Sequence, residues 1–173
     1  MFKKILVANR GEIAVRIIRA CKELNIKTVA IHSNVDTDAM HVKLADESIC
    51  VGSALPNGSY LNIPSIVSAI DITGADAVHP GYGFLSENDK FSKILNSHKV
   101  KFIGPSSKSI LELGNKSNAL NLASNFGLPI LGNKKSKNIE NTNEALKIAN
   151  EIGLPIVIKA AYGGGGKGMR VFN

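Results

Sequence analysis

Short runs of aliphatic and β-branched residues alternate along this chain with stretches whose apolar residues recur at helical spacing. The runs fall at 5–8, 28–31, 48–51, 77–79 and 100–103. The helical stretches between them fall at 12–24, 39–45, 63–72 and about 86–95. Strands that alternate with helices are typical of a parallel sheet covered on both faces. The pattern therefore predicts an α/β fold with a Rossmann-like parallel sheet over residues 1 to about 104.

Capping residues refine these helix boundaries. Gly74 follows the stretch 63–72 and is expected to close that helix, and Ser86 is expected to start the next one. The sequence Gly104-Pro105-Ser106 then interrupts the pattern. Further helices are predicted at 107–113, 117–126 and 142–152, and strands at 155–160 and 169–172, with a polar loop between 131 and 143. The last three elements begin a second unit.

Composition excludes several classes of function. No apolar run approaches the length of about 20 residues that a membrane-spanning helix needs. The net charge is +7, but the lysines are spread along the chain and the densest run, residues 134–137, is typical of a solvated loop. The chain has no tryptophan and few aromatic residues, which leaves no platform for stacking bases. We therefore expect neither a membrane protein nor a nucleic-acid-binding protein.

The cysteines and histidines indicate neither disulfides nor a metal site. The two cysteines, Cys21 and Cys50, lie far apart in apolar stretches and are expected to be buried, reduced thiols of a cytosolic protein. The histidines are scattered and show no metal-ligand spacing. They are His32, His41, His79 and His98.

The most informative motif is the glycine run from Gly163 to Gly166, between Lys159 and Arg170. Consecutive glycines let backbone N–H groups approach an anion, and a cation on each side supplies the charge that phosphate oxygens require. Phosphate binding is thus favoured over a merely flexible hairpin tip. The motif is not a Walker A loop, because Met169 stands where that loop needs lysine.

The first strand runs into a turn, residues 8–14, that opens a helix as in dinucleotide-binding folds. The spacing G-x-G-x-x-G is absent, since only Gly11 is present. A dinucleotide site is therefore not expected. The helix N-terminus could hold another anion, although Glu12 in the first turn opposes it.

Several motifs in order along the chain resemble biotin-dependent carboxylases. They are Ala8-Asn9-Arg10-Gly11-Glu12-Ile13-Ala14, Leu44-Ala45-Asp46-Glu47, Ser59-Tyr60-Leu61-Asn62-Ile63-Pro64, residues 79–88 (HPGYGFLSEN) and Phe102-Ile103-Gly104-Pro105. The glycine run resembles the nucleotide-covering loop of ATP-grasp enzymes. The likeness is strongest to the biotin carboxylase component of bacterial or plastid acetyl-CoA carboxylase. Ala160-Ala161-Tyr162 also resembles pyruvate carboxylase, which leaves the acyl acceptor open.

The resemblance implies a domain plan and a set of ATP contacts. Residues 1–115 would form the N-terminal α/β (pre-ATP-grasp) domain, and residues 116–173 the incomplete start of an ATP-grasp domain. ATP contacts are implied at Lys116, Lys159, Met169 and the glycines Gly163, Gly164, Gly165 and Gly166. The family usually has Gly-Asp-Lys before the second helix, where this chain has Asn115. Asn115 can still cap that helix, but it removes a charge beside Lys116.

The resemblance also suggests two further groups of residues. Tyr82, Gly83 and Glu87 follow a parallel strand and are candidates for a biotin-side pocket, with a structural turn and helix start as the alternative. Arg19 and Glu23 lie one helical turn apart and are candidates for an exposed ion pair or for the family's homodimer contact. The catalytic base, the bicarbonate site and the acidic metal ligands would lie beyond Asn173, with no metal ligand in this chain.

The implied reaction is an ATP-dependent ligation. Such enzymes use ATP and Mg²⁺ to activate bicarbonate as carboxyphosphate and carboxylate biotin on a biotin carboxyl carrier protein, as the first half-reaction of acetyl-CoA carboxylase. The implied partners are the carrier protein, the carboxyltransferase subunits and a second copy of the enzyme. A cytoplasmic location is expected, or the plastid stroma in a plastid-bearing organism. The fragment alone is expected to be inactive and to bind ATP poorly.

Three alternatives remain at this point. The chain could begin a pyruvate or other acyl-CoA carboxylase. It could belong to another ATP-grasp ligase, such as a carbamoyl-phosphate synthetase-like enzyme, although residues 79–88 do not fit that group. It could also be a non-catalytic module that binds anions or nucleotides.

Overall fold

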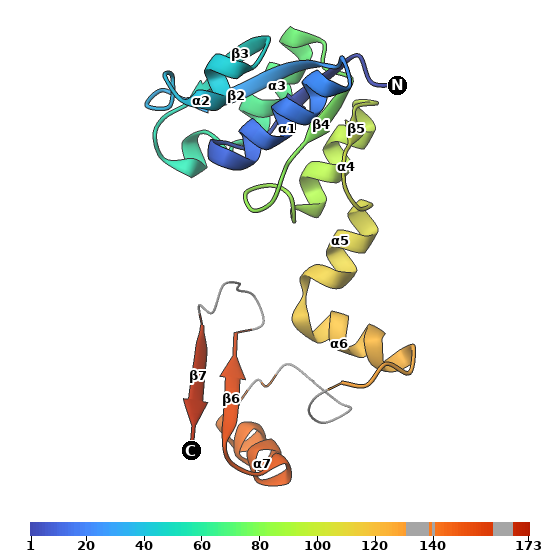
Figure 1. Cartoon of the computed structure of the whole chain (residues 1–173). Helices are drawn as coiled ribbons and strands as arrows, with labels where there is room; N and C mark the ends of the chain where they lie inside the picture. The colour runs from blue at the N-terminus through green and yellow to red at the C-terminus, as the bar shows by residue number, and fades with distance from the viewer. Residues whose placement is uncertain (131–138, 140, 161–167) are drawn as a thin grey trace. The chain divides into compact units, whose positions relative to one another are not determined.

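The first part of the chain forms an open parallel sheet in the computed structural model, which describes residues 1–130, 139, 141–160 and 168–173. Its five strands lie in the order β3-β2-β1-β4-β5 (Figure 1). They are β1 (Lys4–Val7), β2 (Lys27–Ser33), β3 (Glu47–Gly52), β4 (Ala77–His79) and β5 (Lys101–Phe102). The chain builds outward from β1 to β3 and then crosses to β4 on the other side. This arrangement confirms the predicted α/β class.

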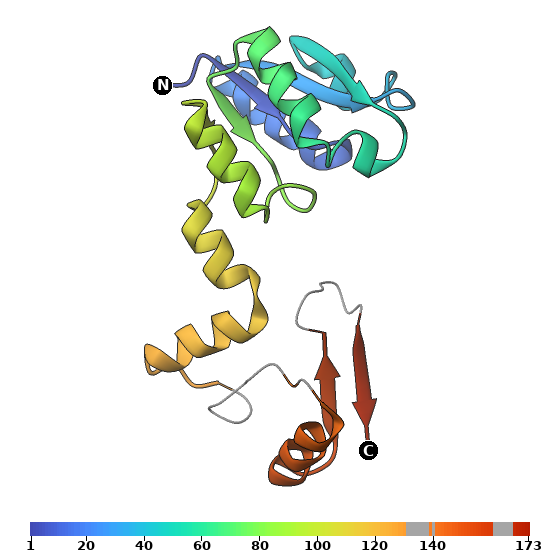
Figure 2. The same ribbon diagram turned by 180° about the vertical axis from the view of Figure 1, so that it is seen from behind.

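Helices cover both faces of the sheet, as the continuous apolar strands require (Figures 1 and 2). Helix α1 (Gly11–Glu23) packs on one face, where Ile17 and Ile18 join Ile5 and Val7 of β1 in one buried cluster. Helices α3 (Ile63–Thr73) and α4 (Asp89–Ser97) pack on the other face. The short helix α2 (Met40–Leu44) and the 3-10 turn η1 (Pro56–Gly58) lie in the connections.

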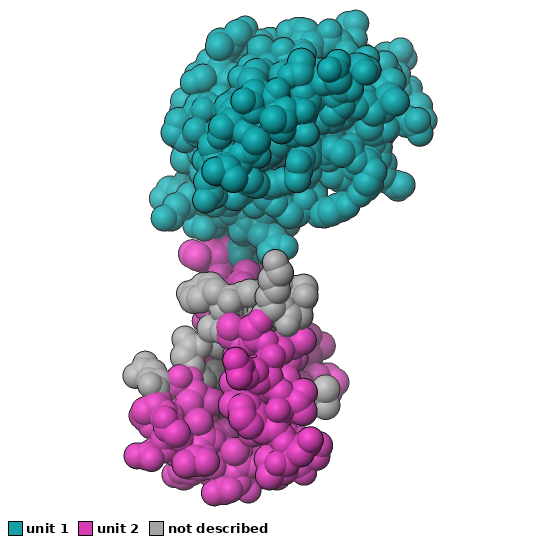
Figure 3. All heavy atoms as spheres, turned by 90° about the vertical axis from the view of Figure 1, so that its left-hand side faces the viewer, with its two compact units in different colours: residues 1–110 teal, residues 111–173 magenta. Residues whose placement is uncertain are grey.

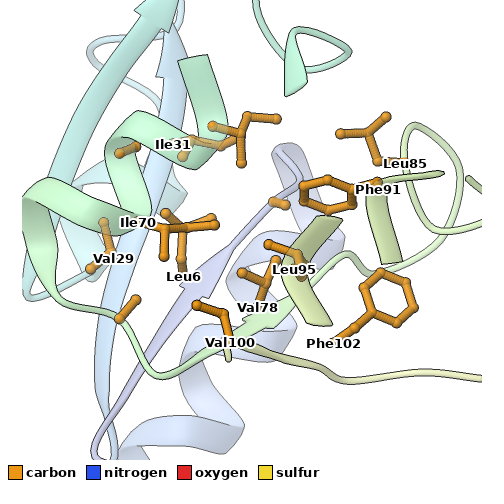
Figure 4. Close-up of a cluster of buried hydrophobic side chains, with 14 of the residues drawn as sticks. Leu6, Val29, Ile31, Ile70, Val78, Leu85, Phe91, Leu95, Val100 and Phe102 are labelled. Carbon is orange, nitrogen blue, oxygen red and sulfur yellow. The ribbon is translucent and has the colours of Figure 1, made fainter. Parts of the chain in front are cut away.

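The larger cluster of buried side chains lies between the sheet and α3 and α4 (Figure 4). Leu6 and Val78 point into it from neighbouring strands, whereas Val7, the residue after Leu6, belongs to the opposite face. Phe91 of α4 and Phe102 of β5 meet edge to face, with ring centroids 6.2 Å apart. Because successive side chains of β1 point to opposite faces of the sheet, this strand contributes to both buried clusters.

Two expectations about this part of the chain are wrong. Helix α4 begins at Asp89 rather than near Ser86, because the Asn88 side chain accepts a hydrogen bond from the Phe91 N–H at 2.8 Å and caps the helix there. Cys21 is buried as expected, but Cys50 is exposed. Cys50 lies on β3, which is an edge strand and is largely uncovered.

The rest of the chain contains helices and a two-stranded hairpin. The elements are α5 (Ser107–Gly114), α6 (Lys116–Asn125), α7 (Thr142–Ile152), β6 (Ile156–Lys159) and β7 (Met169–Phe172). Strands β6 and β7 pair antiparallel. The chain divides into two compact units, Met1–Ile110 and Leu111–Asn173 (Figure 3). The expected polar loop at 131–143 lies mostly outside the described residues.

In the described part of the chain, no helix is both long enough and apolar enough to cross a bilayer.

Candidate functional site

Two loops meet at the carboxyl edge of the sheet, at the point between β1 and β4 where the strand order reverses. Strand β1 runs into residues 9–12, and its neighbour β4 runs into residues 80–84. Because β1 and β4 are parallel and in register from Ile5 with Ala77 to Val7 with His79, both loops leave the same edge. Ligands of open α/β sheets bind at such a reversal point. This edge is therefore the candidate site of the first unit.

Asn9 joins the two loops through its side chain. It is 2% exposed, and its Nδ2 donates hydrogen bonds to the carbonyl oxygens of Pro80 at 2.7 Å and Tyr82 at 2.8 Å. Gly81 has a φ of +65°, and a Cβ built there would lie 2.8 Å from Asn9 Nδ2. Both the backbone angle and the close approach require glycine at this position.

Tyr82, Gly83 and Glu87 are each exposed and lie on the segment between β4 and α4. The Tyr82 hydroxyl donates a hydrogen bond to the Glu12 carboxylate, and this bond raises the pKa of Tyr82. The Tyr82 side chain is 62% exposed, so its ring is available to a ligand. The Glu12 carboxylate, in the first turn of α1, thus binds a phenol hydroxyl.

Arg10 connects this loop to two others, a role that the sequence did not reveal. Its guanidinium lies 5.5 Å from the ring centroid of Tyr60 and 5.8 Å from that of Phe84. Arg10 Nη1 also lies 3.7 Å from Asp36 Oδ2. The signal available in the sequence was a polar Asn-Arg pair placed directly after the first buried strand. Its partners could not be named, because they come from three other segments.

The hairpin carries the candidate nucleotide contacts of the second unit. Lys159, the last residue of β6, stands opposite Met169, the first residue of β7, and the Ala160 N–H donates to the Gly168 carbonyl at 2.9 Å. Directly opposed residues of an antiparallel pair share one face, so Lys159 and Met169 lie on the same face. Both border an open hollow of about 550 Å³. Gly163, Gly164, Gly165 and Gly166 lie outside the described residues.

Asn115 confirms one expectation about the helix that carries Lys116. Its Oδ1 accepts a hydrogen bond from the Asn118 N–H at 3.1 Å, so Asn115 caps α6. Lys116 is the first residue of α6, and its side chain is not among those described. Asn115 therefore caps α6 as the family's aspartate would, but it lacks the negative charge of an aspartate.

Arg19 and Glu23 line a groove along α1. The groove has a volume of about 840 Å³ and is bordered also by α2 residues such as Met40. Within the described part of the chain, Arg19 and Glu23 form no salt bridge within 4 Å. The two side chains are not paired with each other in the structure, and both line the groove.

The described residues contain no group of three or more His, Cys, Asp or Glu side chains that could hold a metal ion. The residues that would bind a nucleotide are instead cationic and apolar. An ammonium group and a flexible thioether on one face suit a phosphate and a flat base, respectively. The described residues of the hairpin thus fit an anionic nucleotide.

Family models match nearly the whole chain. Residues 1–110 match the biotin carboxylase N-terminal domain, and residues 115–173 match the ATP-binding domain of the carbamoyl-phosphate synthase L chain. The two matches and the fold define the class, a Rossmann-like pre-ATP-grasp domain followed by the start of an ATP-grasp domain. The chain belongs to the biotin carboxylase family.

Individual relatives agree with this assignment. The chain is 53% identical over 171 residues to Biotin carboxylase 1 of Bacillus subtilis, covering 99% of this chain and 38% of that protein. It is 51% identical to the mitochondrial propionyl-CoA carboxylase alpha chain of Caenorhabditis briggsae, covering 98% of this chain and 23% of that protein.

A solved structure shares the fold at high similarity. It is the biotin carboxylase domain dimer of Hydrogenobacter thermophilus 2-oxoglutarate carboxylase, in complex with MgADP, ADP and bicarbonate. The TM-score is 0.94 at 46% identity, covering 99% of this chain and 37% of that one. The chain therefore spans less than two fifths of the length of the relatives it matches.

Proposed function

We propose that this chain is the N-terminal part of a biotin carboxylase, an ATP-dependent ligase that carboxylates biotin on a carrier protein with bicarbonate. Residues 1–115 form its first domain, and residues 116–173 begin its ATP-grasp domain. The observation that carries the proposal is the pairing of Lys159 with Met169 on one face of the hairpin, next to the glycine run. The family membership supports the same reading.

The chemistry divides between the nucleotide and the protein. ATP supplies the phosphoryl group that activates bicarbonate, with Mg²⁺ held by residues beyond Asn173. Lys159 extends from a paired strand and directs a fixed positive charge toward the phosphates, and the glycine run supplies backbone N–H donors. Phosphoryl transfer depends mainly on such positioning and charge neutralisation. Lys116 is proposed as a second cation for the nucleotide.

The test measures ADP release by the complete gene product with and without free biotin. Lys159→Gln should raise KM for ATP about tenfold, because a phosphate contact is lost. Lys147→Gln is the matched control, since Lys147 is exposed on α7 in the same unit. It should change KM for ATP by less than about twofold. Nucleotide binding without any biotin-dependent ADP release would support a non-catalytic nucleotide-binding module instead.

The acceptor is proposed to be acetyl-CoA, served through a carrier protein and a carboxyltransferase. Relatives of similar identity include a propionyl-CoA carboxylase chain and the 2-oxoglutarate enzyme, so several acceptors fit. Transfer of labelled bicarbonate to acetyl-CoA, propionyl-CoA or pyruvate, with the carrier and carboxyltransferase encoded in the same genome, distinguishes them. Preference for either of the last two would reject the acetyl-CoA assignment.

The α1 groove is proposed as a contact between two copies of the enzyme. Arg19 and Glu23 face it without pairing to each other, which leaves a positive and a negative group for a partner. Arg19→Glu should shift the complete protein from dimer to monomer in sedimentation velocity. The matched control, Lys22→Glu, alters an exposed charge of the same helix that does not line the groove. An unchanged dimer in the Arg19 variant would contradict the assignment.

A further inference from the structure

The loop from Pro80 to Phe84 adopts a backbone conformation that it cannot hold by itself. Gly81 and Gly83 have φ values of +65° and +67°, and Phe84, which is not a glycine, has a φ of +42°. A bulky residue rarely occupies this left-handed region, and surrounding structure must hold it there. What holds Phe84 therefore decides where Tyr82 and Gly83 lie.

The segment from the end of β1 into the first turn of α1 contacts this loop at four points. Asn9 binds the backbone carbonyls of Pro80 and Tyr82, and the Glu12 carboxylate accepts from the Tyr82 hydroxyl. The fourth contact is the Arg10 guanidinium over the Phe84 ring. Three residues of this short segment, Asn9, Glu12 and Arg10, thus contact the backbone, the phenol and the aromatic ring of a loop some 70 residues further along the chain.

Arg10 is itself held in place by a carboxylate that two hydroxyl groups orient. Asp36, its ion-pair partner, accepts hydrogen bonds from the Tyr60 hydroxyl at 2.6 Å and the Ser33 hydroxyl at 2.7 Å. The Tyr60 bond, followed by the Ser33 bond, lowers the pKa of Asp36, so the carboxylate stays charged opposite Arg10. The Tyr60 ring also contacts the Phe84 ring, with centroids 5.3 Å apart. Arg10 lies between a fixed anion and two aromatic rings.

We infer that Arg10 is a positioning residue that holds Phe84 in its left-handed conformation and thereby sets where Tyr82 and Gly83 meet biotin. Arg10 itself contacts neither the substrate nor the nucleotide in this scheme. The inference rests on the proposed function for its substrate, but the contact between Arg10 and the loop stands independently of it. Loss of Arg10 should weaken biotin binding and leave the ATP-binding hairpin untouched.

The functional test separates the two substrates in the complete gene product. Arg10→Met keeps an unbranched apolar stem and removes the guanidinium with its charge. It should raise KM for free biotin about tenfold and change KM for ATP by less than about twofold. Arg10→Lys, which keeps a cation, should recover part of the loss. Lys22→Met removes an exposed charge from helix α1, which follows Arg10, and should change neither constant.

A structural test follows the loop in the 173-residue chain itself. The Gly81 N–H donates to His79 Nδ1 at 3.0 Å, and the Ser86 N–H donates to the Gly83 carbonyl at 2.9 Å. Amide hydrogen exchange at Gly81 and Ser86 should accelerate about tenfold in the Arg10→Met variant, while exchange in β1 stays unchanged. Phe84→Gly serves as a second variant in case Arg10→Met unfolds. Glycine tolerates the positive φ, so the chain should stay folded, yet without the ring KM for biotin should rise as in Arg10→Met.

The outcomes distinguish the two claims. Unchanged exchange at Gly81 and Ser86 would overturn the positioning role of Arg10. Faster exchange with an unchanged KM for biotin would overturn the link between this loop and biotin. A wild-type protein without biotin-dependent ADP release would overturn the proposed function, and with it the biotin part of this inference. The exchange data would still show whether Arg10 holds the loop at Phe84.

Discussion

The carboxylate of Asp46 joins β2 and β3 at the ends where these two strands begin. Asp46 accepts hydrogen bonds at 2.9 Å from the Lys27 ammonium, the Thr28 N–H and the Thr28 hydroxyl. The Lys27 bond, followed by the Thr28 bonds, lowers the pKa of Asp46 to about 2. The Lys27 side chain is 69% exposed, so water screens its charge, whereas Thr28 is fully buried. We expect the Thr28 bonds to contribute most of the stability.

Asp46→Ala should lower the free energy of unfolding by about 1–3 kcal/mol, because it leaves buried Thr28 groups without a partner. Lys27→Met, the matched control, should lower it much less, because water screens the exposed ion pair. Because folding lowers the pKa of Asp46, its contribution is present above about pH 4 and is lost as the pH falls toward 2. Urea unfolding at pH 7 and pH 3 measures both effects. Equal losses in the two variants at pH 7 would show that the ion pair dominates.

His41 predicts a pH dependence in the same direction, but nearer neutral pH. It is 1% exposed, its Nε2 lies 3.2 Å from the Ile31 carbonyl, and burial lowers its pKa below the usual 6.5. Burial lowers the pKa of His79 too. The unfolded chain therefore binds protons that the folded chain does not, and stability should fall as the pH drops below about 6.5.

The His41→Gln variant should show a shallower loss of unfolding free energy between about pH 7 and pH 5 than the wild type. His79 remains, so some slope persists. The matched control is His98→Gln at an exposed position, which should keep the wild-type slope. Chemical denaturation at several pH values measures the slopes. A His41→Gln slope as steep as that of the wild type would contradict the role of His41.

At the scale of elements, caps determine where the helices begin. Asn62, Asn88, Asn115 and Asn141 each accept a hydrogen bond from a backbone N–H three residues later. The Asn88 bond is the shortest of the four and starts α4, whose Phe91 and Leu95 belong to the main core. Fraying of the first turn of α4 would thus disturb the core.

Asn88→Ala should lower the free energy of unfolding by about 1 kcal/mol, since the cap bond is lost. Asn96→Ala, near the other end of α4, is the control and should be neutral or slightly stabilising, because alanine favours the helix. Thermal unfolding followed by circular dichroism compares the two variants. A loss of equal size at Asn96 would indicate that composition, rather than the cap, controls α4.

The elements themselves could be predicted because their signals are local. Apolar runs and helical spacing located every strand of the sheet, and Gly74 and Asn115 cap their helices as expected. The cap of α4 could not be predicted, because serine and asparagine both cap helices and only the geometry of the turn after β4 decides between Ser86 and Asn88. The hydrogen bond from Asn9 to the Pro80 carbonyl joins residues 71 positions apart, and no spacing rule in the sequence predicts such a contact.

At the scale of the whole molecule, the two units differ in how much of their surface is covered. The first unit contains both buried clusters, including Ile110 at its end. In the second unit, Val157, Ile158, Val171 and Phe172 of the hairpin are each at least 45% exposed. A two-stranded hairpin is marginally stable without a covering layer. The stability of the chain therefore resides in residues 1–110.

A chain cut after Ile110 should keep the unfolding free energy of the 173-residue chain to within about 1 kcal/mol. A cut after Ser106 removes the buried Ile110 side chain and should cost about 2–5 kcal/mol. Urea denaturation of both truncated chains provides the comparison. A large loss already at Ile110 would show that the second unit supports the first.

The central place of β1 has a consequence for the order of events during synthesis. The strand translated first occupies the middle of the sheet, between β2, which follows soon after it, and β4, which begins at Ala77. Until β4 leaves the ribosome, one edge of β1 and the side chain of Asn9 have no partner. Pairing across such a separation is slow, because a long loop must close before any contact forms. The nascent chain therefore displays an open, apolar β-strand edge for most of the time in which its first domain is made, and this is the interval in which it most needs a chaperone.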